Sequence, residues 1–169
     1  MHKFGVGQPL TRKEDLRLLT GQGRYVDDLS LPNQVHAQFL RSPHAHAKVV
    51  QIDTERARLA PGVCAVYVGA DLADAGLRGL PVTFMPEKAP PGYAPEFPLL
   101  ARNVVRYVGE SLAMVIAESA EEAARALDAI EVQYEILPAS VGLEEAASDG
   151  APELWPGKAP FNISFLWDG

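Results

Sequence analysis

The chain of 169 residues has little cysteine and a deficit of positive charge. Its single cysteine, Cys64, excludes an internal disulfide, and one thiol falls short of the roughly four thiolates that hold a [2Fe–2S] cluster. Lys and Arg number 15 against 22 Asp and Glu, which gives a net charge of −7. Phosphate backbones bind basic surfaces, so this balance argues against nucleic acid as the main partner.

Long hydrophobic runs are also missing. No apolar run approaches the roughly 20 residues that span a bilayer, and residues 1–5 lead into polar sequence without the apolar core of a signal peptide. We therefore expect no membrane span and a cytoplasmic location. The apolar content of 47% suffices for one ordinary core, so the length and composition predict one compact domain with tails.

Residues 102–139 give the clearest structural pattern, which predicts a strand, a turn, a strand, a helix and a strand. The β-formers of 104–108 stop at Gly109, and the apolar run 112–117 has the length of a strand buried on both faces. After the helix, residues 131–136 alternate with period two, and the side chains expected to point inward are Val132, Tyr134 and Ile136.

The helix between these strands has a recognisable start. The Ser119 side chain can accept a hydrogen bond from a backbone N–H of the first helical turn, which has no partner within the helix. The Glu122 side chain can reach back toward Ser119 to complete a capping box. The apolar stripe is made of small side chains, so we expect the helix to lie close against a sheet. The predicted stripe comprises Ala120, Ala123, Ala124, Leu127 and Ile130.

The remaining segments complete an α+β pattern, with a mixed sheet and a few short helices packed on it. Strands are predicted over 35–41, 48–53 and 63–68, with a turn at Ser42–Pro43 between the first two. Short helices are predicted over 54–59 and from Ala70, and one helical turn over 14–19. Residues 76–103 predict a long loop ordered by packing or by a partner, because they contain Pro81, Pro86, Pro90, Pro91, Pro95 and Pro98.

The C-terminal segment alternates like a strand. Its apolar positions are Phe161, Ile163, Phe165 and Trp167. A strand with so many apolar side chains, and with no following strand to pair with, leaves an exposed apolar edge. We therefore expect the chain to be the leading piece of a longer polypeptide or a split gene product that another chain completes.

Three groups of residues suggest chemistry, and each has a plainer interpretation. His44 and His46 are metal-ligand types, but they lack a third ligand nearby, which favours a turn or an interdomain contact. Cys64 lies in a predicted strand with no partner His, so we expect it in the core. Glu110 follows Gly109 at a strand end, where a structural or interface role is expected.

Five ordered blocks of sequence resemble the large, molybdenum-binding subunit of the molybdenum hydroxylases. This family includes xanthine dehydrogenase, aldehyde oxidase and carbon monoxide dehydrogenase. The blocks include RSPHAHA, YVGE and YEILP, and they occupy 12–28, 41–47, 61–63, 107–110 and 134–138. The resemblance is to the N-terminal α/β hammerhead domain. It implies an arm over 1–33, the hammerhead domain over 34–147 and a segment over 148–169 that leads into downstream domains.

The resemblance implies a structural and assembly role in an oxidoreductase that acts on an aldehyde, an N-heterocycle or carbon monoxide. It implies no catalytic, cofactor-binding or metal-binding residue in these 169 residues. Molybdopterin, [2Fe–2S] clusters and FAD would belong to the complete enzyme, and the partners would be the downstream domains and the iron–sulfur and flavin subunits. The candidate interdomain contacts are Arg41, Ser42, Pro43, His44, Tyr107, Gly109, Glu110, Phe165 and Trp167.

Two alternatives stay open from the sequence. The first is a free-standing binding or assembly module that has the hammerhead fold and no catalysis. The second is a small independent enzyme that uses His44, His46 or Glu110, although no acid/base pair or nucleophile arrangement emerges around them.

Overall fold

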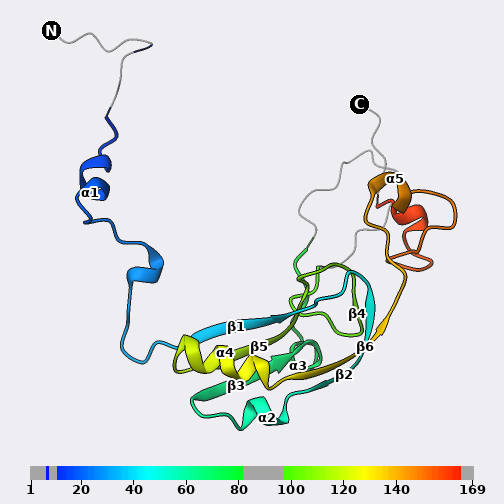
Figure 1. Ribbon diagram of the computed structural model, residues 1–169, viewed down its shortest axis with the longest axis horizontal. Helices are drawn as coiled ribbons and strands as arrows, with labels where there is room; N and C mark the ends of the chain where they lie inside the picture. Colours follow the sequence, from blue (N-terminus) through cyan, green and yellow to red (C-terminus); the bar gives the residue numbers. More distant parts are fainter. Residues whose placement is uncertain (1–6, 8–10, 82–96, 165–169) are drawn as a thin grey trace. The chain divides into compact units, whose positions relative to one another are not determined.

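The computed structural model describes residue 7 and residues 11–81 and 97–164 (Figure 1). The chain divides into two compact units, Met1–Gln34 and Val35–Gly169. The first unit contains α1 (Asp15–Leu19), as the sequence predicts, and the 3-10 turn η1 (Val26–Asp28). Across the described stretches, no helix has the length and apolar character to cross a membrane.

The second unit contains two three-stranded sheets, and every recorded pairing between their strands is antiparallel. The first sheet has the order β1-β5-β3, with β1 at His36–Arg41, β5 at Ser111–Ala117 and β3 at Val63–Val68. The second has the order β4-β2-β6, with β4 at Val104–Val105, β2 at Ala47–Asp53 and β6 at Glu131–Ile136.

Short helices complete the unit. They are α2 (Glu55–Arg58), α3 (Gly69–Asp74), α4 (Ala120–Asp128), α5 (Leu143–Ala146) and the 3-10 turn η2 (Pro160–Asn162). Figure 1 shows α4 lying across β1, β5 and β3. The predicted α+β class, with a few short helices packed on sheet, is therefore confirmed. The strands form two sheets with antiparallel pairings rather than the one mixed sheet that the sequence analysis expects.

The main core forms between α4 and the first sheet. Alternate residues of the central strand β5 point at the helix, and Ala113, Val115 and Ala117 are fully buried there. The helix contributes Ala123 and Ala126, whose small side chains allow the close approach that the sequence predicts. The expected stripe is wrong at two positions, since Ala120 and Ala124 are exposed.

The start of α4 follows the predicted cap with one difference. Ser119 Oγ accepts from the backbone N–H of Glu122 at 3.2 Å. The Glu122 carboxylate accepts from the Ser119 hydroxyl at 2.8 Å rather than from the Ser119 backbone N–H. The cap therefore satisfies one orphan amide of the first helical turn.

A second core lies on the opposite face of β5. Leu112 is fully buried against Ala47, Ala101 and Val105, and Tyr134 packs at its border. Because Leu112 belongs to the first sheet while Ala47 and Val105 belong to the second, this cluster joins the two sheets. The prediction that residues 112–117 are buried on both faces therefore holds at Leu112 but not along the whole strand, since Met114 and Ile116 on the same face are only half-buried.

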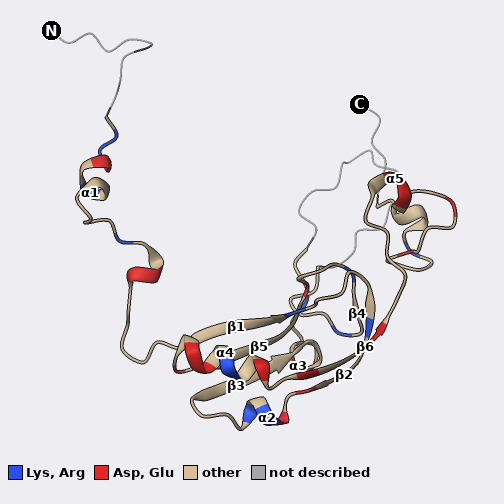
Figure 2. Ribbon diagram, in the orientation of Figure 1, with Lys and Arg blue, Asp and Glu red and all other residues tan. Residues whose placement is uncertain are grey.

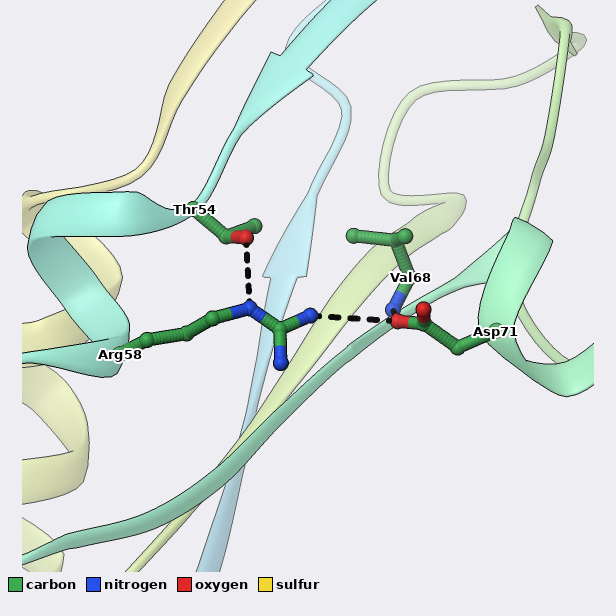
Figure 3. A network of polar contacts seen from close by, with 4 residues as sticks. All are labelled: Thr54, Arg58, Val68 and Asp71. Carbon is green, nitrogen blue, oxygen red and sulfur yellow. Dashed lines mark hydrogen bonds and ion pairs between the residues drawn. The ribbon is translucent and has the colours of Figure 1, made fainter.

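A polar network ties α2 to α3 across the end of β3 (Figure 3). The Arg58 guanidinium donates to Thr54 Oγ1 at 3.0 Å and to Asp71 Oδ2 at 3.4 Å. The same Asp71 oxygen accepts from the backbone N–H of Val68 at 2.8 Å, which caps α3. The exposed Arg58–Asp71 pair contributes little by itself, so the cap is the main local effect.

Two strand residues that the sequence predicts to be buried are exposed. Cys64 is exposed, not in the core, since the β3 register skips it between Val63 and Ala65, and this bulge turns it outward. Ile136 is 69% exposed, because it lies at the end of the edge strand β6 opposite the small side chain of Ala47.

One further strand is shorter than expected, and the described part of another predicted strand, residues 161–164, does not form one. β4 ends at Val105 rather than at residue 108, and Tyr107 and Val108 lie in a turn. At the C-terminus, Phe161 and Asn162 both have a φ of 56°, a left-handed conformation that a strand cannot contain, and they form part of η2. Residues 165–169, the rest of the predicted strand, lie outside the described residues, as do residues 82–96 of the predicted loop.

Candidate functional site

The predicted contact residues meet where the chain twice passes from one sheet to the other. The segment 42–46 leads from β1 in the first sheet to β2 in the second, and 106–110 leads from β4 in the second to β5 in the first. We call residues 41–46 and 106–110 together the crossing junction. Its two segments lie side by side, because Ser42 N–H donates to Glu110 O at 2.9 Å and Gly109 N–H donates to Ser42 O at 2.8 Å.

Ser42 organises the first segment of the crossing junction. Its side chain is buried, and its Oγ accepts from the His44 N–H at 3.0 Å and donates to the His44 carbonyl at 2.9 Å. Such short-range side-chain bonds fix a turn in place of a strand ladder. The sequence interpretation of a turn at Ser42–Pro43 is confirmed.

Glu110 organises the second segment. The residue is only 4% exposed, and its Oε2 accepts from the Arg106 backbone N–H at 2.6 Å. Burial raises the pKa of the Glu110 carboxyl above its ordinary value, while the hydrogen bond and the charge of Arg106 act in the opposite direction. The buried Glu110 side chain therefore holds residues 106–110 in a turn through its bond to the Arg106 amide.

Gly109 and Arg41 hold the two segments in register. Gly109 has a φ of 93°, a conformation that side chains disfavour, and space around its Cα is open, so the backbone angle alone explains the glycine. The Arg41 guanidinium donates to Gly109 O at 2.9 Å and to Ser111 Oγ at 3.2 Å. The register of β1 against β5 shifts between Leu40 and Arg41, at the edge of the junction.

Aromatic side chains border the crossing junction. Tyr107 is 43% exposed and stacks on Phe97, with ring centroids 6.2 Å apart. Burial is the largest cause that raises the pKa of Tyr107; the negative charge of Glu110 adds to it, and the positive charge of Arg41 opposes it. His44 meets Tyr134 edge to face at 4.7 Å, and burial raises the pKa of Tyr134.

His46 has a structural partner. Its Nδ1 lies 2.7 Å from Pro138 O, and because a carbonyl only accepts, the ring nitrogen is the donor. This bond fixes the start of β2 to the residues after β6. Over residues 11–81 and 97–164, no three His, Cys, Asp or Glu side chains are grouped to hold a metal ion.

Arg106 is a junction residue that the sequence did not single out. Its Nε donates to Leu154 O at 2.8 Å, and its guanidinium lies 3.5 Å from the centroid of the Trp155 ring. Residues 146–162 are further fixed by Asn162, which accepts from Leu154 N–H and donates to the carbonyls of Ala146 and Pro152. No local sequence pattern reveals the contacts of Arg106, because 48 residues separate it from Leu154.

The structure therefore brings together seven of the nine predicted contact residues. They are Arg41, Ser42, Pro43, His44, Tyr107, Gly109 and Glu110. Phe165 and Trp167 lie outside the described residues. An oxygen of Glu110 is bonded to a backbone amide, His44 packs against the Tyr134 ring, and His46 is bonded to a backbone carbonyl. An interdomain role for these residues stays a prediction.

The chain is similar to proteins of one family over nearly its whole length. It is 39% identical to the nicotine 6-hydroxylase large subunit of Paenarthrobacter nicotinovorans, over 94% of this chain and 19% of that protein. It is 39% identical to the carbon monoxide dehydrogenase large chain of Afipia carboxidovorans, over 89% of this chain and 17% of that protein. The chain thus spans about a fifth of the length of these relatives.

Solved structures agree with the sequence comparison. Quinoline 2-oxidoreductase from Pseudomonas putida 86 superposes with a TM-score of 0.79 at 43% identity, over 90% of this chain and 19% of that one. The family model described as the aldehyde oxidase and xanthine dehydrogenase a/b hammerhead domain matches residues 20–138. The chain belongs to this aldehyde oxidase and xanthine dehydrogenase hammerhead family.

Proposed function

We propose that this chain acts as the N-terminal structural and assembly domain of the large subunit of a molybdenum hydroxylase. One observation carries the proposal: 39% identity extends over 94% of this chain but over only 19% of the nicotine 6-hydroxylase large subunit. Domains of one chain pack on one another through interdomain interfaces, and we infer that such packing is the contribution of this domain. The complete enzyme would oxidise an aldehyde, an N-heterocycle or carbon monoxide in the cytoplasm.

The residues present do not fit an iron–sulfur cluster. Such clusters need about four thiolates, and the chain has one cysteine, Cys64, which is exposed. We therefore propose that molybdopterin, iron–sulfur clusters and FAD are held by the downstream domains and by separate iron–sulfur and flavin subunits. This chain would supply contacts to those parts and no reacting group.

The crossing junction is the surface that we propose for interdomain contact. Its turn presents Tyr107 at 43% exposure and Val108 at 65% exposure. The turn beneath them is fixed by Glu110 and Gly109, so the two side chains are held in place before a partner arrives. Phe97, which is 53% exposed, stacks on Tyr107, so these apolar side chains adjoin one another, and contiguous exposed apolar groups are one mark of a contact site. Phe165 and Trp167 belong to the same proposal on sequence grounds alone.

The proposal is tested first in the source DNA. Reading past the codon for Gly169 should reveal several hundred further codons with glycine-rich molybdopterin loops. A stop codon there, without a neighbouring gene for the rest of a large subunit, favours the free-standing module instead.

The surface is tested in the complete large subunit, expressed with its partner subunits. We expect Y107S/V108S to lower the yield of assembled enzyme, measured by size-exclusion chromatography. The matched control is V50S/L59S, which replaces two other apolar side chains that are 63% and 86% exposed. Equal yields for both double variants would contradict the proposed surface.

A further inference from the structure

The first sheet has two faces, and α4 packs on one of them. Ala113, Val115 and Ala117 of β5 point at the helix and are fully buried. Residues paired across neighbouring strands share a face, so the register of β1 and β3 against β5 places two apolar rows on the other side. We call these two rows the open face; they comprise Ala37, Ile116 and Ala65 in the first row and Phe39, Met114 and Tyr67 in the second.

The second sheet covers only one end of this side of β5. Leu112 is buried in the cluster that joins the two sheets, but Met114 and Ile116, on the same side of the strand, are only half-buried. Phe39 is 41% exposed and Tyr67 is 38% exposed. Among the described residues, neither core cluster includes any member of the open face.

The two sheets differ in what they expose. An antiparallel sheet can leave one face in water, and such a face then carries polar side chains. The second sheet follows this rule, since Lys48 pairs with Glu135 at 2.8 Å and Gln51 lies opposite Gln133, and all four residues are exposed. In the first sheet, Arg41 is the only Lys, Arg, Asp or Glu of the three strands, and Figure 2 shows these strands almost wholly in tan. The open face therefore has the composition of a contact surface rather than of a solvated one.

Arg41 connects the open face to the crossing junction. Its guanidinium lies 5.8 Å from the centroid of the Phe39 ring, and it donates to Gly109 O at 2.9 Å. Arg41 and Gly109 both belong to the crossing junction, which presents the exposed Tyr107 and Val108. The open face thus adjoins the surface that is proposed for interdomain contact.

We propose that the open face packs against an apolar layer of the same large subunit, formed by polypeptide that follows Gly169. This inference rests on the proposed function and adds to it a second contact surface and the chemistry of its partner. The chain covers only 19% of the nicotine 6-hydroxylase large subunit, so most of such a subunit is available to supply the layer. A second copy of the chain is disfavoured as the occupant, because each copy has a net charge of −7 and like charges oppose association.

Photo-crosslinking identifies the occupant in the complete large subunit, expressed with its partner subunits. The photoreactive residue p-benzoylphenylalanine replaces Phe39, and a matched control carries it in place of Val50, an apolar residue of β2 that is 63% exposed. After irradiation, mass spectrometry should find the residue at position 39 joined to a peptide of the same polypeptide encoded beyond Gly169. The control at position 50 should not give that product.

Hydroxyl-radical oxidation measures burial of the same face without any substitution. Between the isolated 169-residue chain and the complete subunit, oxidation of Tyr67 and Met114 should fall at least about threefold, because an interface core is shielded from solvent. Two leucines serve as controls. Leu59, which is 86% exposed on the other side of the domain's charged sheet residues' helix α2, should change by less than about twofold. Leu112, which is fully buried, should stay protected in both samples if the isolated chain is folded.

The outcomes separate this inference from the proposed function. If the reading frame continues past Gly169 but Tyr67 is as reactive in the complete subunit as in the isolated chain, the open-face inference alone is refuted. It is also refuted if the residue at position 39 is joined to a second copy of the large subunit, to an iron–sulfur or flavin subunit, or to nothing. If the reading frame ends at Gly169 and no neighbouring gene encodes the rest of a large subunit, the proposed function fails and this inference fails with it.

Discussion

Two substitutions of Glu110 separate two contributions to the free energy of unfolding: the destabilisation from its buried charge and the stabilisation from its hydrogen bond. Glu110 is 4% exposed, and its Oε2 accepts from Arg106 N–H at 2.6 Å. E110Q keeps the volume and a carbonyl acceptor but removes the charge. E110A removes the acceptor as well, and leaving an inner amide without a partner costs about 1–3 kcal/mol. At pH 8 we expect E110Q to be at least as stable as the unsubstituted protein, and E110A to be less stable by that amount.

The pH dependence of the stability difference between E110Q and the unsubstituted protein tests the same reasoning independently. Burial raises the pKa of Glu110 in the folded state above the ordinary 4.5. A carboxyl with a raised folded pKa contributes stability that is fully present below the unfolded value and is lost as the pH rises through the folded value. The stability advantage of E110Q should therefore be near zero at pH 4 and should grow toward pH 8.

The assay is urea unfolding followed by circular dichroism at several pH values, with each variant compared with the unsubstituted protein at the same pH. Taking this difference at one pH cancels the contributions of the other titrating groups to stability. The cancellation requires that the substitution leaves the contacts of those groups unchanged. If E110Q is less stable at pH 8 by more than about 1 kcal/mol, the ionised carboxylate is needed in the turn, and the reasoning from burial is refuted.

Three further substitutions test the rest of the fold, two by urea unfolding and one by limited proteolysis. L112A removes a fully buried side chain from the cluster that joins the sheets, so we expect a loss of about 2–5 kcal/mol; the control V50A, at an exposed site, should change stability by less than about 0.5 kcal/mol. S119A removes the acceptor for the Glu122 amide and should cost about 1 kcal/mol, whereas an unchanged value would show that the cap is redundant. N162A removes three hydrogen bonds that hold residues 146–162, so limited proteolysis should cut there first; unchanged cleavage would contradict this role.

Local patterns predicted those parts of the fold that depend on neighbouring residues. The apolar run of β5, the Ser119 cap and the small side chains facing the first sheet follow from spacing within about ten residues. The turn at Ser42–Pro43 follows from turn chemistry. The sequence blocks around residues 41 and 107 also marked two segments that the fold brings together, although spacing gives no reason for their contact.

Features that depend on register or on distant segments could not be predicted. Cys64 is exposed because β3 skips one residue against β5, and no residue type announces that bulge. Phe161 breaks an alternating pattern by adopting a positive φ, which tertiary bonds of Asn162 favour over a strand. The stacking of Arg106 on Trp155 likewise joins segments that are far apart in the sequence.

The central claim is that this chain works as an assembly domain of a molybdenum hydroxylase. The most direct measurement is to isolate the native protein from its source with an antibody raised against residues 20–138, and to determine its molybdenum content and its polypeptides by mass spectrometry. The account predicts molybdenum, peptides from domains downstream of Gly169, and iron–sulfur and flavin polypeptides in the same complex. A molybdenum-free chain isolated without those polypeptides would contradict it.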